Sequence, residues 1–163
     1  MKAVQKLRLY EQEQHGTCGP ASLRMALTCF GVFLSEAELV ARCHTWLGIL
    51  DSIYWGGTSR KNLAEATRKT GHYLNSKKNA EWYDLIVYSK LGVPVIVEWI
   101  SDRDGEKSDC HYSVVLRATE EWVRLADPQF GDVWACSRQH FERRWLGFEP
   151  DGSISYRFLL ALT

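Results

Sequence analysis

Long hydrophobic runs are missing from this chain of 163 residues. No apolar stretch approaches the roughly 18 residues that a helix needs to cross a membrane. The N-terminal sequence MKAVQKLRLYEQEQ also lacks the apolar core of a signal peptide. We therefore expect a cytoplasmic protein with no membrane span in this chain.

An excess of charge of either sign is missing as well. Twenty lysines and arginines balance twenty aspartates and glutamates, so the formal net charge at pH 7 is zero. Proteins that bind nucleic acids or anionic membranes usually carry a surplus of basic residues. The composition therefore indicates no nucleic-acid partner.

Paired cysteines are the third absence. The five cysteines are an odd number without a repeated spacing, unlike the framework of a disulfide-rich secreted domain. The alternative is a zinc site assembled from two cysteines and two histidines, namely His15, Cys18, Cys43 and His44. That set contains no CxxC pair, the usual feature of structural zinc sites. We predict a reducing compartment, no metal and no cofactor.

The hydrophobic periodicity changes along the chain, from a helical period in the first half to β-branched strands in the second. With 45% hydrophobic and 25% charged residues, the chain is expected to form one globular domain over residues 1–163. The expected helices lie at 18–30, 35–43, 59–71, 79–91 and 137–145, and the expected strands at 3–10, 73–74, 93–100, 112–118, 122–126, 133–135 and 154–162. This order predicts an α+β fold, with an N-terminal helical layer packed on a C-terminal antiparallel sheet.

Capping signals support several of these helices. Ser35 and Glu38 have the spacing of a capping box. Thr58 or Ser59 can cap the third helix and Ser137 the last one.

One cysteine lies where a loop is predicted to become a helix. In the sequence GTCGPASLRMA, Gly19 allows a tight turn after Cys18, and Pro20 suits the first helical turn. Unpaired N–H groups and the positive end of the helix dipole favour the thiolate, which is the nucleophilic form. Gln12, six residues earlier, can help to bind an oxyanion, and Gln14 is the alternative. A lone cysteine beside a helix is more often an inert core residue, so this stretch alone identifies no nucleophile.

A histidine and an aspartate lie at matching ends of two predicted strands. His111 opens the strand CHYSVVLRA, and Asp127 ends the strand VRLAD. If the strands form a hairpin, both side chains lie at the same sheet edge. The carboxylate would then orient the imidazole, and the other ring nitrogen would face a thiol. Each residue alone would be read as a surface or turn residue, and only their joint placement points to catalysis.

A glycine pair beside aromatic residues suggests a substrate groove. Gly56 and Gly57 would let an extended peptide approach backbone to backbone, with Trp55 and Trp99 as walls. The alternative, that these aromatic side chains fill the core, stays open.

Three blocks together resemble the double-glycine leader peptidases, which process bacteriocins and have the papain-like fold. The likeness is carried by Gln12 with CGPASLRMAL, by GGTSRKNLAEATRKTG followed by LGVPVIVEW, and by HYSVVLRATEEWVRLADP. Cys110 departs from the pattern, because the family often has glycine before the histidine.

The resemblance implies a cysteine peptidase in which Cys18 is the nucleophile, His111 the base, Asp127 its orienter and Gln12 the oxyanion residue. The substrate would be a peptide or protein cleaved after Gly-Gly or other small residues in a leader. Many members of the family are parts of exporters, so association with an exporter is also implied.

Two other functions stay open. An acyl transferase, transpeptidase or deamidase shares the thioester step, and the sequence does not separate water from an amine as the acceptor. A silent peptide-binding module typically lacks a catalytic residue, whereas all four candidates are present here.

Overall fold

The computed structural model describes residues 3–47, 57–103, 105, 109–149 and 151–163. Its helices are the 3₁₀ helix η1 (Ala3–Lys6), α1 (Cys18–Thr28), α2 (Glu36–Arg42), α3 (Arg60–Lys69), α4 (Trp82–Leu91) and α5 (Arg138–Arg144). Its strands are β1 (Tyr73–Lys77), β2 (Val95–Ser101), β3 (Asp109–Ala118), β4 (Trp122–Asp127), β5 (Asp132–Ser137), β6 (Leu146–Phe148), β7 (Ile154–Tyr156) and β8 (Leu159–Leu162).

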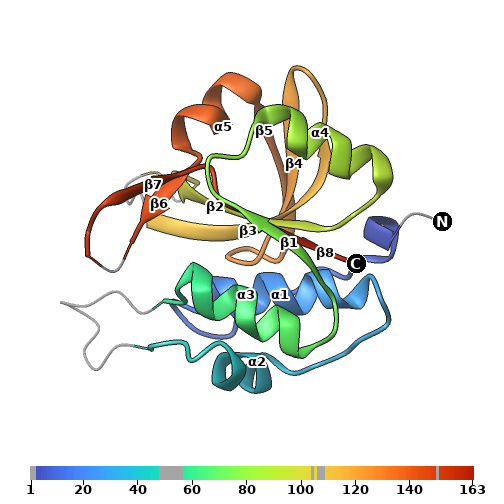
Figure 1. Ribbon diagram of the computed structural model, residues 1–163, viewed down its shortest axis with the longest axis vertical. Coiled ribbons are helices and arrows are strands. Elements are labelled where there is room, and N and C mark those ends of the chain that lie inside the picture. Colours follow the sequence, from blue (N-terminus) through green and yellow to red (C-terminus); the bar gives the residue numbers. More distant parts are fainter. Residues whose placement is uncertain (1–2, 48–56, 104, 106–108, 150) are drawn as a thin grey trace.

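A six-stranded antiparallel sheet, in the order β1-β8-β2-β3-β4-β5, runs through the middle of the molecule. Helices α1 and α3 lie against one face with α2 beyond them, and α4 and α5 cover the other face (Figure 1). The predicted α+β class is confirmed, with the refinement that helices lie on both faces of the sheet.

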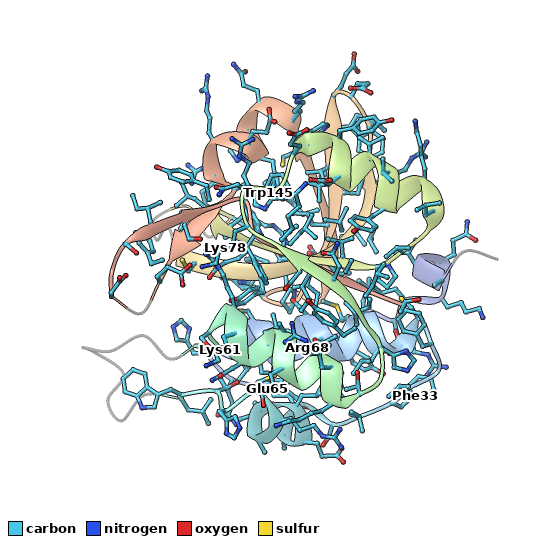
Figure 2. All side chains as sticks on the ribbon, viewed as in Figure 1. Phe33, Lys61, Glu65, Arg68, Lys78 and Trp145 are labelled. Carbon is cyan, nitrogen blue, oxygen red and sulfur yellow. The ribbon has the colours of Figure 1, made fainter. Side chains whose placement is uncertain are left out.

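Each face of the sheet has its own hydrophobic core. The core under α1 contains Leu23, Leu27 and Ile96, and the core under α5 contains Phe141 and Trp145. In Figure 2, Trp145 lies between α5 and the sheet, whereas the charged side chains labelled on α3 point outward. The sheet is therefore held from both sides, as expected for a buried central layer.

Helix α1 is buried almost all round, and this fixes where its first residue lies. Every residue from Cys18 to Thr28 except Arg24 is buried. The helix packs against β3 on one side and against α2 and α3 on the other. A helix that is apolar on all sides belongs in a protein interior, so its N-terminus is held against the sheet edge.

The capping predictions are confirmed. Ser35 and Glu38 form a reciprocal capping box at the start of α2. The hydroxyls of Ser59 and Ser137 accept backbone N–H groups at the starts of α3 and α5. Of the two candidates at the third helix, Ser59 is therefore the cap.

Two strand predictions are wrong. Residues 3–6 form the 3₁₀ helix η1, whose Val4 N–H donates to the Gly92 carbonyl (3.0 Å), because no sheet edge takes up this segment. The terminal strand is broken in two at Arg157, which has a positive φ of 52°. Strand β7 pairs with β6, which the sequence did not predict, and β8 joins the main sheet.

Within the described ranges, no helix has both the length and the apolar character that crossing a membrane requires.

Candidate active site

Cys18 is the first residue of α1 and is only 9% exposed. Its neighbour Thr17 occupies the N-cap position without capping, because its hydroxyl donates to the Gln14 carbonyl instead (2.7 Å). The helix therefore begins without a side-chain cap from Thr17. The sulfur lies at the positive end of a buried helix, an environment that favours a negative charge.

Gly19 has a different role from the tight turn that the sequence suggested. It lies inside α1, and a Cβ built at this position would be 3.0 Å from Thr58 Cβ and 3.4 Å from Tyr112 Cδ2. The Tyr112 hydroxyl donates to the Thr58 carbonyl (3.0 Å), which fixes both neighbours. Glycine is required here because β3 and the segment before α3 approach the helix closely.

Strands β3 and β4 form an antiparallel hairpin pair that brings His111 and Asp127 together. His111 Nε2 is 2.6 Å from Asp127 Oδ1, and both side chains are buried. An interaction with the Cys18 thiol is among the causes that raise the pKa of this imidazole. Since Nε2 faces the carboxylate, Nδ1 is the nitrogen left for the sulfur. The structure thus brings Cys18, His111 and Asp127 into one buried cluster.

The charge state of this cluster follows from competing effects. Burial lowers the pKa of His111, but the hydrogen bonds to Asp127 and Cys18 outweigh it and raise the pKa to about 9. Burial raises the pKa of Asp127, but the bonds from His111 and Arg103 outweigh it and hold this pKa below its ordinary value. At neutral pH the pair is therefore an imidazolium and a carboxylate.

The segment that carries Gln12 lies against the turn after Asp127. The Gln12 backbone N–H donates to the Pro128 carbonyl (2.7 Å), and Gly131 in the same turn closely approaches the backbone of Glu11. Gln12 Nε2 donates to the Gln14 carbonyl (2.9 Å), whereas its Oε1 is buried without a partner among the described residues. Nε2 carries two hydrogens, and one of them makes the bond to the Gln14 carbonyl.

The predicted groove residues fall into two groups. Trp55 and Gly56 lie outside the described residues. Gly57 is described: its N–H and carbonyl both pair with Trp46 in an isolated antiparallel bridge (2.7 and 3.0 Å). An added Cβ at Gly57 would meet nothing within 4 Å, so the chain there has open space on one side.

Trp99 differs from the groove wall that was expected. It is 0% exposed, stacks on Trp134 with ring centroids 5.2 Å apart, and donates from Nε1 to Ser113 Oγ (3.0 Å). The Trp99 and His111 rings are in an edge-to-face arrangement, with their centroids 6.2 Å apart. Trp99 faces inward on β2, so it supports the imidazole from within the core.

The remaining cysteines differ from Cys18 in their surroundings. Cys29 and Cys43 are buried, and burial raises the pKa of each to about 12, which makes them inert core thiols at neutral pH. Cys110, the residue before His111, is exposed. In the described part of the chain, no three His, Cys, Asp or Glu side chains gather as metal ligands.

Arg103 is the site neighbour that the sequence did not reveal. It lies in the charged segment between β2 and β3, yet its side chain is 12% exposed and its Nη1 donates to Asp127 Oδ2 (2.7 Å). An arginine in a charged loop carries no local signal that it folds back onto a strand end.

A buried helix with a cysteine at its N-terminus, packed on an antiparallel sheet that holds a histidine and an aspartate, defines the papain-like cysteine peptidase fold. Residues 4–152 match the sequence profile of the Peptidase C39 like family, and the chain belongs to this family. The family resemblance deduced from the sequence is thereby confirmed.

Two solved structures and one relative illustrate the likeness. The peptidase domain of Streptococcus ComA, a bifunctional ABC transporter involved in a quorum-sensing pathway, has a TM-score of 0.68 and 25% identity, covering 96% of this chain and 99% of that domain. A double-glycine-motif protease from an AMS/PCAT transporter, solved in complex with the leader peptide, has a TM-score of 0.63 and 20% identity, covering 99% and 94%. An uncharacterized protein of Methanothermobacter thermautotrophicus is 31% identical over 140 residues, covering 83% of this chain and 81% of its own length.

Proposed function

We propose that this protein is a cysteine peptidase that cleaves a peptide or protein substrate after Gly-Gly or other small residues. One observation carries the proposal: the buried His111 Nε2–Asp127 Oδ1 contact of 2.6 Å, on a ring that also reaches the thiol at the start of α1. A nucleophile, a base and an orienting carboxylate in this order are the requirements of covalent acyl transfer.

In the proposed first step, the Cys18 thiolate attacks the carbonyl carbon of the scissile bond and forms a C–S bond. The resulting oxyanion accepts hydrogen bonds from the Cys18 backbone N–H and from Gln12 Nε2. The His111 imidazolium then gives its proton to the leaving nitrogen, and the C–N bond breaks. The product amine departs, and a thioester stays on Cys18.

In the second step His111, now neutral, takes a proton from a water molecule that attacks the thioester. The C–S bond breaks, and the carboxylic acid product leaves. Asp127 accepts a hydrogen bond from Nε2 throughout, so it holds the ring and stabilises its charged form. The surroundings of Gln14 support Gln12 as the oxyanion residue, because the Gln14 side chain is exposed and its carbonyl is already bonded to Gln12 and Thr17.

The substrate class rests on the family and on the ComA peptidase domain, at 25% identity. Because that domain belongs to a transporter, we include association with an exporter in the proposal. The geometry of Gly57, with open space on one side, is compatible with an extended peptide at this position.

The test uses a peptide aldehyde that ends in Gly-Gly and a matching peptide substrate. We expect the aldehyde to add to Cys18, as seen by intact mass and peptide mapping, and the substrate to be cut after the second glycine. Cys110→Ser is the matched control, because this exposed thiol should be dispensable for both reactions.

The same experiment separates the rival functions. Added amines that appear in the product mass would indicate an acyl transferase or transpeptidase. A peptide that binds tightly, without adduct or cleavage, would indicate a silent binding module and would overturn the proposal.

A further inference from the structure

Arg103 joins two carboxylates across the turn between β4 and β5. Its Nη1 donates to Asp127 Oδ2 (2.7 Å) and to Asp132 Oδ1 (2.8 Å), and its Nη2 donates to Asp132 Oδ2 (3.0 Å). Asp127 and Asp132 are the last register pair of these strands. The guanidinium therefore closes the end of the hairpin on which Asp127 lies.

Two aromatic rings lie close to the guanidinium. Its carbon lies 4.3 Å from the centroid of the Phe130 ring and 5.6 Å from the Trp134 ring. A planar guanidinium that is stacked and bonded at two nitrogens has little rotational freedom. Arg103 is thus a rigid contact rather than a solvated surface charge.

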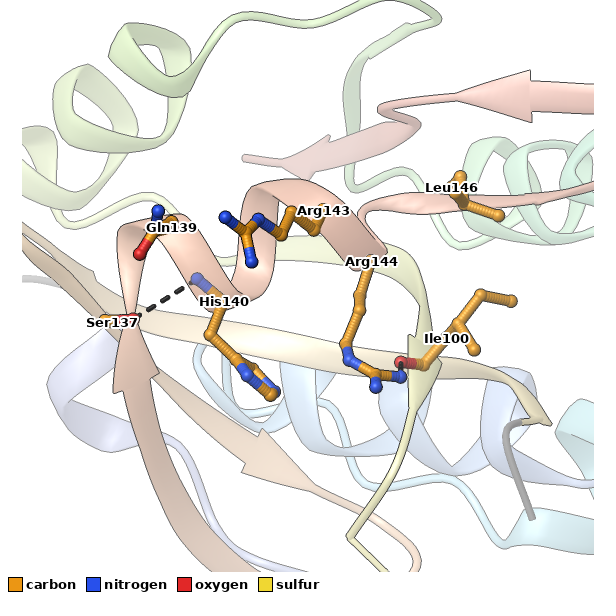
Figure 3. A pocket seen from close by; sticks show the side chains of 7 residues that line it. All are labelled: Ile100, Ser137, Gln139, His140, Arg143, Arg144 and Leu146. Carbon is orange, nitrogen blue, oxygen red and sulfur yellow. Dashed lines mark hydrogen bonds between the residues drawn. The ribbon is translucent and has the colours of Figure 1, made fainter.

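The backbone that carries Arg103 is itself fixed by α5. In the carboxylate of Asp102, Oδ1 lies 3.3 Å from His140 Nε2 and Oδ2 lies 3.1 Å from Arg144 Nη2. Arg144 also donates to the Ile100 carbonyl at the end of β2 (3.5 Å), and Figure 3 shows it reaching from α5 to this strand. Loop and helix together set the position from which Arg103 reaches Asp127.

The two oxygens of Asp127 have separate partners. Oδ1 accepts from His111 Nε2 (2.6 Å) and from the Gln129 N–H (3.0 Å), whereas Oδ2 accepts from Arg103. Without Arg103, Oδ2 would be a fully buried carboxylate oxygen with no partner among the described residues. Such an oxygen is costly to leave unpaired, which favours rotation of the carboxylate away from the imidazole.

We infer that Arg103 is a positioning residue that locks the Asp127 carboxylate in the orientation in which Oδ1 holds His111. It acts through Asp127 and touches neither the thiol nor the reacting bond. In the peptidase it would set the geometry of the base, and this part rests on the proposed function.

A titration of His111 separates positioning from a simple charge effect. The titratable groups that act on His111 are Asp127 and Cys18, and Asp127 is in turn bonded by Arg103. If Arg103 only supplied charge, its removal would leave Asp127 in place and raise the pKa of His111. If Arg103 positions Asp127, its removal weakens the His111–Asp127 bond and lowers that pKa.

The experiment follows the His111 ring by NMR in the full chain, with Arg103→Met as the test variant and Arg103→Lys as the conservative one. We expect the pKa of His111, about 9 in the native protein, to fall by about 1 or more in Arg103→Met. Arg103→Lys restores it in part, because one ammonium replaces a two-point contact. Arg138→Met is the matched control, since that arginine pairs with Glu142 and should leave His111 unchanged.

If Arg103→Met unfolds, Arg103→Lys carries the test, because its weaker contact to Asp127 should still lower the pKa of His111. Asp132→Asn removes a charge from the same network but keeps the Arg103–Asp127 bond, so the pKa of His111 should change less than in the Arg103 variants. If peptidase activity exists, kcat should fall about 10- to 100-fold in Arg103→Met with little change in KM. A raised or unchanged pKa of His111 in folded Arg103→Met overturns the inference, whether or not the protein proves to be a peptidase.

Discussion

Helix α1 carries a cysteine at each end, and the two thiols have opposite surroundings. Cys18 is its first residue and Cys29 its C-cap, and both are buried. Around Cys29, burial alone dominates and raises the pKa of the thiol to about 12. Cys18 lies instead at the positive helix end, within reach of an imidazole whose own pKa is raised to about 9.

Since Cys18 and Cys29 are both buried, burial alone does not make a thiol reactive. A buried thiol without a charged partner stays protonated, because its anion is poorly solvated. A buried thiol beside an imidazolium at a helix N-terminus has two sources of stabilisation for the anion. One source is the N-terminus of α1 itself and the other is the imidazole on β3, and Cys29, at the opposite end of the helix, has neither.

The largest effect that would test this comparison is expected from removing each sulfur in turn. Cys18→Ala should lower kcat/KM by about 10⁴-fold or more, because the covalent route is lost. Cys29→Ala should keep activity and lower the free energy of unfolding by about 1 kcal/mol, since it leaves a small cavity. Cleavage assays of both variants give kcat/KM, and urea unfolding gives the free energy of unfolding. Equal activity of the two variants would remove Cys18 from the mechanism.

The next effect concerns the oxyanion. Gln12→Ala should lower kcat about 100- to 1000-fold, the cost of one missing donor, with a smaller change in KM. Gln14→Ala is the control: the side chain of Gln14 is exposed, and its backbone carbonyl, which accepts from Gln12 and Thr17, is kept in the variant. The measurement is the steady-state kinetics of both variants. A larger loss of kcat in Gln14→Ala than in Gln12→Ala would contradict Gln12 as the oxyanion residue.

The third effect depends on pH. Because the pKa of His111 is raised from its ordinary 6.5 to about 9, its imidazolium contributes stability that is complete below about 6.5 and is lost as the pH rises through about 9. Cleavage should decline only as the pH rises through about 9, since the neutral ring cannot protonate the leaving amine. A kcat/KM profile and thermal unfolding across pH 6 to 10 measure both. A decline that already begins near pH 6.5 would show that Asp127 and Cys18 do not hold the proton on this ring.

Much of this architecture could be predicted from local patterns. The start of α1, the capping box at Ser35 and the pairing of the strands that carry His111 and Asp127 follow from short-range signals. The hairpin prediction succeeded because strand ends joined by a tight connection must lie side by side.

What failed depends on contacts between distant segments. The break at Arg157 arises because β7 pairs with β6 while β8 enters the main sheet between β1 and β2. Arg103 folds onto Asp127 because α5 holds the preceding residue in place. Trp99 is a core residue because Trp134 on β5 stacks against it. Each of these partners is distant in sequence from the residue that it contacts, so no local sequence pattern predicts the contact.

The smallest expected effect compares the glycines that flank the two thiols. In Gly19→Ala the new methyl group lies 3.0 Å from Thr58 Cβ, so overpacking of about 1–3 kcal/mol is only partly offset by a helix-propensity gain of about 1 kcal/mol. In Gly31→Ala nothing lies within 4 Å, but the φ of +75° places an alanine in the left-handed region at a cost of about 1–2 kcal/mol. Both variants should therefore lose similar stability in urea unfolding, for different reasons. Only Gly19→Ala should also lower kcat/KM, because relief of its clash moves the helix end that carries Cys18. Equal activity of the two variants at matched stability would mean that the start of α1 tolerates displacement, and that close packing there serves the fold alone.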